Sequence, residues 1–239
     1  MGILLSKKNI LLVIGALVLV VASFSINYSQ IKPEEPSLNL PEEIKDEGFR
    51  LIQKASENYF FHEYLKANEN YHKAISIFKA RNDFRQVGII HESIGDVYLI
   101  TNNIPAAETE YLTAVTSHGK AQFPLGKAQA LKKIGDMYIE LNQGETGASW
   151  YKKALVEINK EPASLILAQI EESLGRYYWG LKDKPKAIEF ITAAKKTFRS
   201  LGHQMGFEHM SHILDILLEK SSELHPHAMR SRSPSDNKL

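Results

Sequence analysis

The sequence predicts an all-α protein, an α-solenoid of stacked helical hairpins that follows a single N-terminal transmembrane or signal helix. Two observations lead to this prediction. A stretch recurs at a spacing of forty residues, as SIGDVYLITNN from Ser93, KIGDMYIELNQ from Lys133 and SLGRYYWGLKD from Ser173. In addition, an uncharged apolar run covers residues 10–26. Repeats of this length are typical of arrays in which each unit buries its hydrophobic face against the next unit.

Composition places the chain among ordinary globular proteins. It has 239 residues, of which 44% are hydrophobic and 24% are charged, and its formal net charge is +1. This balance gives no strong basic field, so we expect no nucleic-acid partner. The sequence has no cysteine, which excludes disulfides, thiolate metal sites and a cysteine nucleophile.

Residues 1–27 are predicted to form a membrane anchor or a signal segment. The apolar run over 10–26 would span roughly 25 Å as a helix at about 1.5 Å per residue, enough for a thin or locally adapted bilayer. A cleaved signal peptide usually has a shorter apolar run and an A-x-A-like end, whereas the best candidate end here is Ser23-Phe24-Ser25. We therefore favour an uncleaved anchor over a cleaved signal peptide or a buried helix of a soluble domain.

The charges on either side of the apolar run predict its orientation. Lys7 and Lys8 precede the run, whereas residues 27–48 carry two lysines and six acidic residues. Basic residues stay preferentially on the cytoplasmic side of a membrane helix. The N-terminus is therefore expected in the cytoplasm, and the rest of the chain is expected outside it, in the periplasm if the protein is bacterial.

Two segments lack the pattern of a folded core. Residues 28–42 form an acidic stretch with Pro33, Pro36 and Pro41 and few bulky side chains, which predicts a semi-rigid, solvated stalk. Residues 221–239 have no apolar periodicity and are predicted to be a disordered tail. The folded domain is expected between these two segments.

Residues 43–220 are predicted to form about four helical repeats and a capping helix over 206–220. A small residue that faces another lets two antiparallel helices approach closely, while aromatic side chains fill the wider gaps beside them. Breaks with a capping residue or a proline at 102–105, 142–144 and 183–185 separate the two helices of a hairpin. The small positions are Ala55, Gly95, Gly135 and Gly175 in the first helices, and Ala67, Ala107, Gly147 and Ala187 in the second helices.

This pattern resembles the tetratricopeptide repeat (TPR) family, whose units carry Leu-Gly and Tyr in the first helix and Ala, Phe or Tyr, and Ala in the second helix. The resemblance covers about residues 48–201. The period of forty residues is longer than the usual thirty-four and resembles the longer-helix, forty-residue subclass found in kinesin light chains, LGN-type adaptors and Rap-type bacterial regulators. The first unit departs from the pattern, with Ala55 and Asn58 where the family has Gly and Tyr.

The resemblance implies a concave groove, lined by the first helices, that binds a protein or peptide partner. Several co-chaperones of this family grip a C-terminal carboxylate with lysine and asparagine, and this sequence lacks those residues at the corresponding positions. A chaperone tail is therefore not the expected partner. The groove positions of the family correspond here to Ile89, Glu92, Asp96, Leu99, Gln129, Lys132, Asp136, Glu140, Gln169, Glu172, Arg176 and Trp179.

The charge at one of these positions changes along the repeats. Asp96, Asp136 and Arg176 occupy equivalent positions, so a partner segment with lysine or arginine is expected at the second repeat. Trp179 is expected to offer an apolar or cation–π contact at the other end. Lysine in place of both aspartates is expected to slow partner association without lowering thermal stability.

The sequence shows no pattern typical of an enzyme or a metal site. His209 and His212 lie one helical turn apart but have no third ligand nearby in the sequence. Glu171 and Glu172 are adjacent and therefore point to different sides of a helix. No glycine-rich phosphate loop and no G-x-S-x-G motif occur. We therefore expect no catalytic residue, cofactor, metal or small-molecule substrate.

Together these observations predict a non-enzymatic, membrane-tethered TPR scaffold that binds a protein or peptide partner in its groove outside the cytoplasm. The main alternative is a peptide-sensing signalling regulator of the Rap type, against which the apolar run and the acidic stalk weigh. An enzyme is the third class. It would require an activity that a single carboxylate or histidine substitution abolishes.

Overall fold

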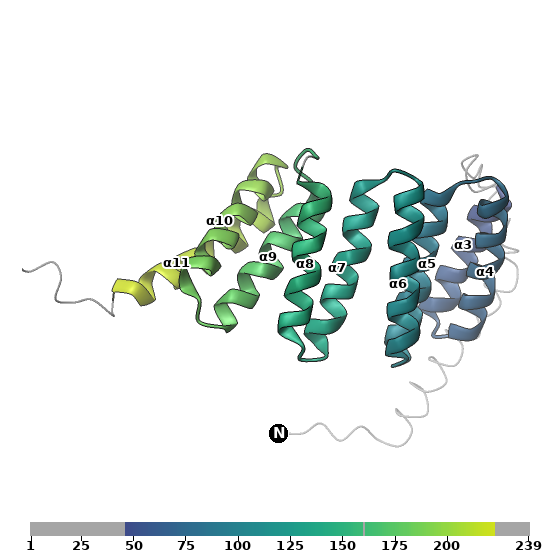
Figure 1. The fold of residues 1–239 in the computed structure, drawn as a ribbon, viewed down its shortest axis with the longest axis horizontal. Coiled ribbons are helices and arrows are strands. Elements are labelled where there is room, and N and C mark those ends of the chain that lie inside the picture. The colour runs from purple at the N-terminus through teal and green to yellow at the C-terminus, as the bar shows by residue number, and fades with distance from the viewer. Residues whose placement is uncertain (1–45, 160, 223–239) are drawn as a thin grey trace, which may run out of the picture. The chain divides into compact units, whose positions relative to one another are not determined.

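The computed structural model describes residues 46–159 and 161–222, and all regular structure in these residues is α-helical. The predicted segments 1–27 and 28–42 and most of the tail 221–239 lie outside the described residues. Within the described residues, no helix has both the length and the apolarity needed to cross a bilayer. Figure 1 shows the helices in chain order. They are α3 (Glu47–Phe60), α4 (Tyr64–Ala80), α5 (Phe84–Ile100), α6 (Ile104–Lys120), α7 (Pro124–Glu140), α8 (Gly144–Ile158), α9 (Leu165–Gly180), α10 (Lys184–Ser200) and α11 (Gln204–Ser222).

Consecutive helices pair into hairpins. α3 packs on α4, α5 on α6, α7 on α8 and α9 on α10, and α11 packs on α10. First helices also touch across repeats, since α5 contacts α7 and α7 contacts α9, whereas neighbouring second helices make few or no such contacts. The first helices therefore lie on the inner side of this array.

Most turns of the array, both within and between hairpins, are of one kind, in which a residue just after a helix has a left-handed backbone. Asparagine tolerates this conformation better than most residues do, and it occupies three of these positions. The side chain of the next residue then caps the following helix at Asp83, Asn103 and Asp183. The left-handed residues are His62, Asn82, Asn102, Gln122, Asn142, Lys182 and Gly202.

The small residues predicted at the helix crossings do bring backbones together. A Cβ atom on Gly135 would lie 2.6 Å from the Tyr151 ring and 3.1 Å from the carbonyl oxygen of Gly147. A Cβ atom on Gly147 would lie 2.8 Å from the carbonyl oxygen of Gly135. The third hairpin is therefore held at a separation that only glycine permits at these two positions.

The C-terminal helix α11 is the predicted capping helix, and it begins at Gln204 rather than at Gly206. It runs to Ser222, so the first two residues of the predicted tail are helical. Met210, Ile213 and Leu217 are buried in the core formed with α9 and α10. The helix thus covers an apolar surface that would otherwise end the array.

Candidate functional site

The twelve predicted groove residues lie on the first helices α5, α7 and α9, but they differ in what they offer to a partner. Ile89, Glu140 and Arg176 are exposed, and most of the others are half-buried. Gln129 and Gln169 are half-buried and belong to neither of the two inner-face pockets described below. Exposure and the contacts of each side chain therefore decide which residues form a site.

Glu92 offers a partner the least exposed surface of the twelve residues, because its carboxylate is buried and hydrogen bonded inside the array. The residue is 8% exposed, and its Oε1 lies 2.9 Å from Nε2 of the fully buried His118. His118 belongs to the second helix of the same hairpin. A buried, hydrogen-bonded carboxylate supports packing rather than partner contact.

Asp96 and Asp136 lie at predicted groove positions, and each also hydrogen bonds to a tyrosine on the second helix of its hairpin. Asp96 accepts a 2.7 Å hydrogen bond from the Tyr111 hydroxyl, and Lys133 lies 2.7 Å from both of its carboxylate oxygens. Asp136 accepts a 2.7 Å hydrogen bond from the Tyr151 hydroxyl. One carboxylate on the first helix and one tyrosine on the second thus join the two helices of each of these hairpins.

The environment of both tyrosines keeps them protonated, so that they remain donors. Burial raises the pKa of Tyr111 far above its ordinary value, and the Asp96 carboxylate raises it further. Burial and the Asp136 carboxylate do the same to Tyr151. Lysine at both aspartates would leave two largely buried hydroxyls without their acceptors, so it is now expected to lower stability, contrary to the expectation from the sequence.

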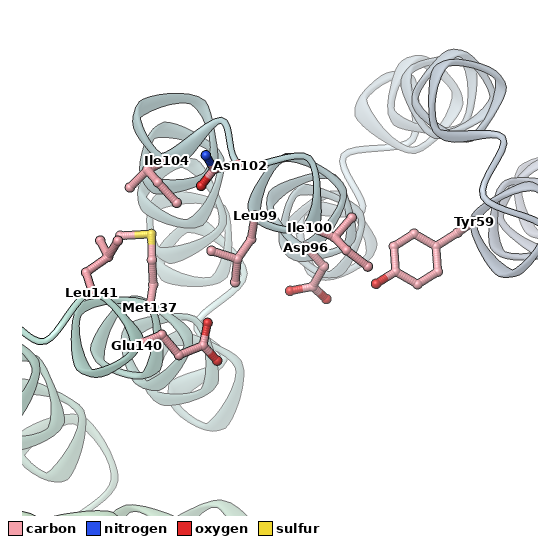
Figure 2. Close-up of a pocket in the computed structure, with 9 residues that line it drawn as sticks. All are labelled: Tyr59, Asp96, Leu99, Ile100, Asn102, Ile104, Met137, Glu140 and Leu141. Carbon is pink, nitrogen blue, oxygen red and sulfur yellow. The ribbon is translucent and has the colours of Figure 1, made fainter.

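A pocket with a volume of about 490 Å³ opens between the C-terminal ends of α5 and α7. Figure 2 shows the carboxylates of Asp96 and Glu140 and the hydroxyl of Tyr59 directed into this space. Burial raises the pKa of Tyr59, with a further contribution from Asp96. The walls are mainly apolar. The lining residues are Tyr59, Asp96, Leu99, Ile100, Asn102, Ile104, Met137, Glu140 and Leu141.

Three of these lining residues, Asp96, Leu99 and Glu140, were predicted from the sequence. The others were missed because they lie at helix ends, in a turn or on α3, whereas the family pattern marks only positions along the first helices. Ile100 and Leu141 are apolar residues just before a predicted turn, which was the available signal in the sequence. The structure shows that both are exposed. Tyr59 comes from the neighbouring hairpin and gave no such signal.

The predicted residues on α9 are tied to one another and to α11. Nε of Arg176 lies 2.9 Å from Oε1 of Glu172, and its Nη2 lies 2.7 Å from Nε2 of His209. Trp179 is half-buried and packs against the C-terminal core. Of these residues, Arg176 presents the most polar surface to a partner, because more than half of its side chain is exposed.

The described residues show no arrangement for metal binding. No three histidine, aspartate or glutamate side chains come together there as a metal site would require. His209 and His212 are both exposed, and Nε2 of His209 lies 2.7 Å from Nη2 of Arg176 and 3.8 Å from Oε1 of Glu172.

Comparison with known proteins finds relatives in structure only. No protein-family model matches the chain, and no curated protein matches it. BtubC (BKLC) from P. vanneervenii aligns over 77% of this chain and 85% of its own length, with a TM-score of 0.50 and 16% identity. The apo form of RapI aligns over 74% of this chain with a TM-score of 0.61 and 15% identity, and the chain spans 65% of the length of RapI.

A third solved structure, a putative kinesin light chain from Podosopora anserina with TPR-like repeats, aligns over 73% of this chain at 9% identity. Its TM-score is 0.49. At these identities the likeness concerns the fold alone. The paired helices, their forty-residue period and the likeness to BtubC and RapI together show that the described part of this chain is a TPR-like array of helical hairpins.

Proposed function

We propose that this chain is a non-enzymatic scaffold that binds a protein or peptide partner on the inner face of its first helices. The pocket between α5 and α7 is the observation that carries this proposal. It combines apolar walls with two carboxylates and a hydroxyl, which suits an inserted side chain of a partner. The TPR-like fold supports the same function, since stacked hairpins present an extended inner surface.

We further propose that the scaffold is tethered to a membrane by residues 1–27 and faces the outside of the cytoplasm. The support is in the sequence, where Lys7 and Lys8 precede the apolar run 10–26 and an acidic segment follows it. On this proposal the stalk 28–42 separates the binding face from the bilayer.

Charge reversal at Glu140 tests the proposed binding face. Glu140 is exposed, and within the described residues no cation pairs with it, so Glu140→Lys changes the pocket without breaking an internal contact. The full chain, solubilised gently from membranes, is used to capture partners, which are quantified by mass spectrometry. A partner of the inner face should be captured several-fold less by Glu140→Lys.

The matched control is Glu189→Lys, which makes the same charge change at an exposed position on the second helix α10. Capture should be unchanged in this control. Equal loss in both variants would indicate a general charge effect, and loss in the control alone would place the partner on the outer face. Either result would contradict the proposed site.

A peptide-sensing regulator of the Rap type is the second candidate, and the likeness to RapI at a TM-score of 0.61 is compatible with it. A regulator must change conformation when its peptide binds, whereas a scaffold need not. Hydrogen exchange of the full chain with and without the captured ligand distinguishes them. Altered protection limited to the first helices α5, α7 and α9 favours a scaffold, and altered protection that extends to the second helices α6, α8 and α10 favours a regulator.

A further inference from the structure

The pocket between α5 and α7 has a counterpart one repeat further along the array. A second pocket, of about 420 Å³, opens between α7 and α9 and includes the turns at their C-terminal ends. Six positions are equivalent in the two pockets after a shift of forty residues. These pairs are Leu99 and Ile139, Asn102 and Asn142, Ile104 and Gly144, Met137 and Tyr177, Glu140 and Gly180, and Leu141 and Leu181.

The two pockets are lined at six equivalent positions, but they differ in charge. In the first pocket, the charge of Asp96 is matched by Lys133. Glu140 has no such partner within the described residues, so the first pocket carries about one negative charge in excess. We refer to it as the acidic pocket. Glycine replaces this glutamate at position 180 of the second pocket, which removes the carboxylate there.

The second pocket contains Arg176 and no carboxylate among its lining residues, and we refer to it as the arginine pocket. The guanidinium has five N–H donors. Its Nε and Nη2 both lie 2.9 Å from Oε1 of Glu172, and Nη2 also lies 2.7 Å from Nε2 of His209. The two donors on Nη1 therefore remain for a ligand. Glu172 pairs with this guanidinium as Lys133 pairs with Asp96, but Glu172 does not line the pocket. The Nη1 donors therefore still favour a carboxylate oxygen of a ligand.

The distance between the pockets follows from helix packing. α5 contacts α7 and α7 contacts α9, and the axes of packed helices lie about 8–10 Å apart. The pockets are therefore separated by about 10 Å. An extended peptide advances about 3.3 Å per residue, so side chains about three residues apart reach the two pockets.

From this juxtaposition we propose that the acidic pocket and the arginine pocket together select an extended peptide segment by the order of its charges. The segment carries lysine or arginine in the acidic pocket and, about three residues away, an aspartate, a glutamate or a terminal carboxylate in the arginine pocket. The apolar walls hold the intervening residues. This inference rests on the proposed partner-binding function and adds the chemistry of the partner.

Selection from a displayed library of random twelve-residue peptides tests the inference, with the full chain in detergent micelles as the target. The enriched peptides should carry a basic residue three positions from an acidic residue. Glu140→Lys should change the preference at the basic position only, and Arg176→Gln should weaken the preference at the acidic position only. Glu189→Lys should leave both preferences unchanged.

The affinity of an enriched peptide is then measured by fluorescence anisotropy, with the natural chain and with the Glu140→Gln variant. Replacing its basic residue by glutamine should weaken binding to the natural chain by about two- to fivefold, as expected for an exposed charge pair. The same replacement should have no effect on binding to Glu140→Gln. Equal weakening in both proteins would overturn the assignment of the acidic pocket.

The outcomes separate this inference from the proposed function. Enriched peptides without ordered charges would overturn the inference and leave the binding face standing. If the library yields no peptide while capture of a protein still depends on Glu140, the extended segment is wrong but the function holds. If neither peptide binding nor capture depends on Glu140, both are wrong.

Discussion

His118 shows how one hairpin differs from its repeats at a single buried position. The equivalent residues in the other hairpins are Phe78, Ile158 and Phe198, all of them buried and apolar. The imidazole packs between helices so tightly that a Cβ atom on Gly88 would lie 2.5 Å from it. Its Nε2 contacts Glu92, while its Nδ1 has no hydrogen-bond partner. A polar pair has thus replaced an apolar contact.

The first hairpin provides a natural test of this pair, because it carries Ile52 and Phe78 at the two equivalent positions. His118→Phe should destabilise the fold by about 1–3 kcal/mol, since it leaves the buried Glu92 without its partner. Glu92→Ile combined with His118→Phe should recover most of this loss. Urea unfolding followed by circular dichroism measures both. A single variant as stable as the natural chain would mean that the pair contributes nothing.

Gly135 allows a second test at the residue scale. Gly135→Ala should cost about 1–3 kcal/mol, because its Cβ would lie 2.6 Å from the Tyr151 ring. Gly119 in α6 is the control, since nothing lies within 4 Å of a Cβ atom there. Gly119→Ala should be neutral or stabilising by up to about 1 kcal/mol, as expected for a helix. Equal melting temperatures of the two variants would contradict the close helix crossing.

The sequence predicted which residues lie on the same face of each first helix, but it did not predict how deeply each side chain is buried. The period of forty residues correctly identified Asp96 and Asp136 as equivalent positions on first helices. It did not show that Tyr111 and Tyr151 hydrogen bond to these carboxylates, because such a contact joins two helices and depends on their separation. For the same reason it placed Glu92 in the groove and gave no role to His118.

At the scale of the helix, α9 illustrates how adjacent glutamates serve different surfaces. Glu171 Oε2 accepts a 2.8 Å hydrogen bond from the Thr197 hydroxyl on α10, whereas Glu172 contacts Arg176 on its own helix. This agrees with the prediction that the two point to different sides. Burial raises the pKa of Glu171 above its ordinary value of 4.5, although Thr197 and Lys196 partly oppose the shift.

This shift predicts a pH dependence of stability. The folded state holds the Glu171 proton more tightly than the unfolded chain does, so the contribution of Glu171 falls as pH rises from 4.5 through the raised pKa. Glu171→Gln removes the charge but keeps an acceptor for Thr197. The variant should therefore melt at a higher temperature than the natural chain at pH 7, and this difference should shrink below about pH 4.5. A difference that does not change with pH would contradict the burial of this carboxyl.

The helix α11 is predicted to be required as a cap. Removing residues after 203 would expose the apolar surface that Met210, Ile213, Leu214 and Leu217 cover. A net decrease of about 3 kcal/mol in the free energy of unfolding would lower the melting temperature of an array of this size by roughly 6–12 °C. A chain that ends at Ser222 retains α11 and serves as the control. Equal melting of the two truncated chains would show that the array needs no cap.

At the scale of the whole molecule, the fold was predictable because every hairpin repeats the same small residues and turns. The pockets were not, because each forms where the ends of two first helices meet a turn, and a pattern within one repeat does not describe that junction. The exchange of Glu140 for Gly180 is visible in the sequence. Its meaning depends on knowing that the two residues line equivalent pockets.

The proposed topology gives a prediction for the intact cell. Protease added outside cells or spheroplasts should digest the helical array, whereas protease on the cytoplasmic side should remove only residues before the apolar run 10–26. Protection of the array from outside protease would refute this orientation. Mass spectrometry of the N-terminus separates an anchor from a cleaved signal, since a mature chain that starts near Ile26 would exclude the anchor.

The left-handed residues between helices have a consequence for how such a chain can evolve. Asn102 and Asn142 occupy the same place in successive hairpins, with φ near 59° in both. A genetic duplication or deletion of forty residues that begins and ends at such a place would join two turns of identical geometry, and no helix would change its phase. Length can therefore vary in whole hairpins. Each added hairpin would bring one more inner-face pocket whose charge is set by the residues equivalent to 136 and 140.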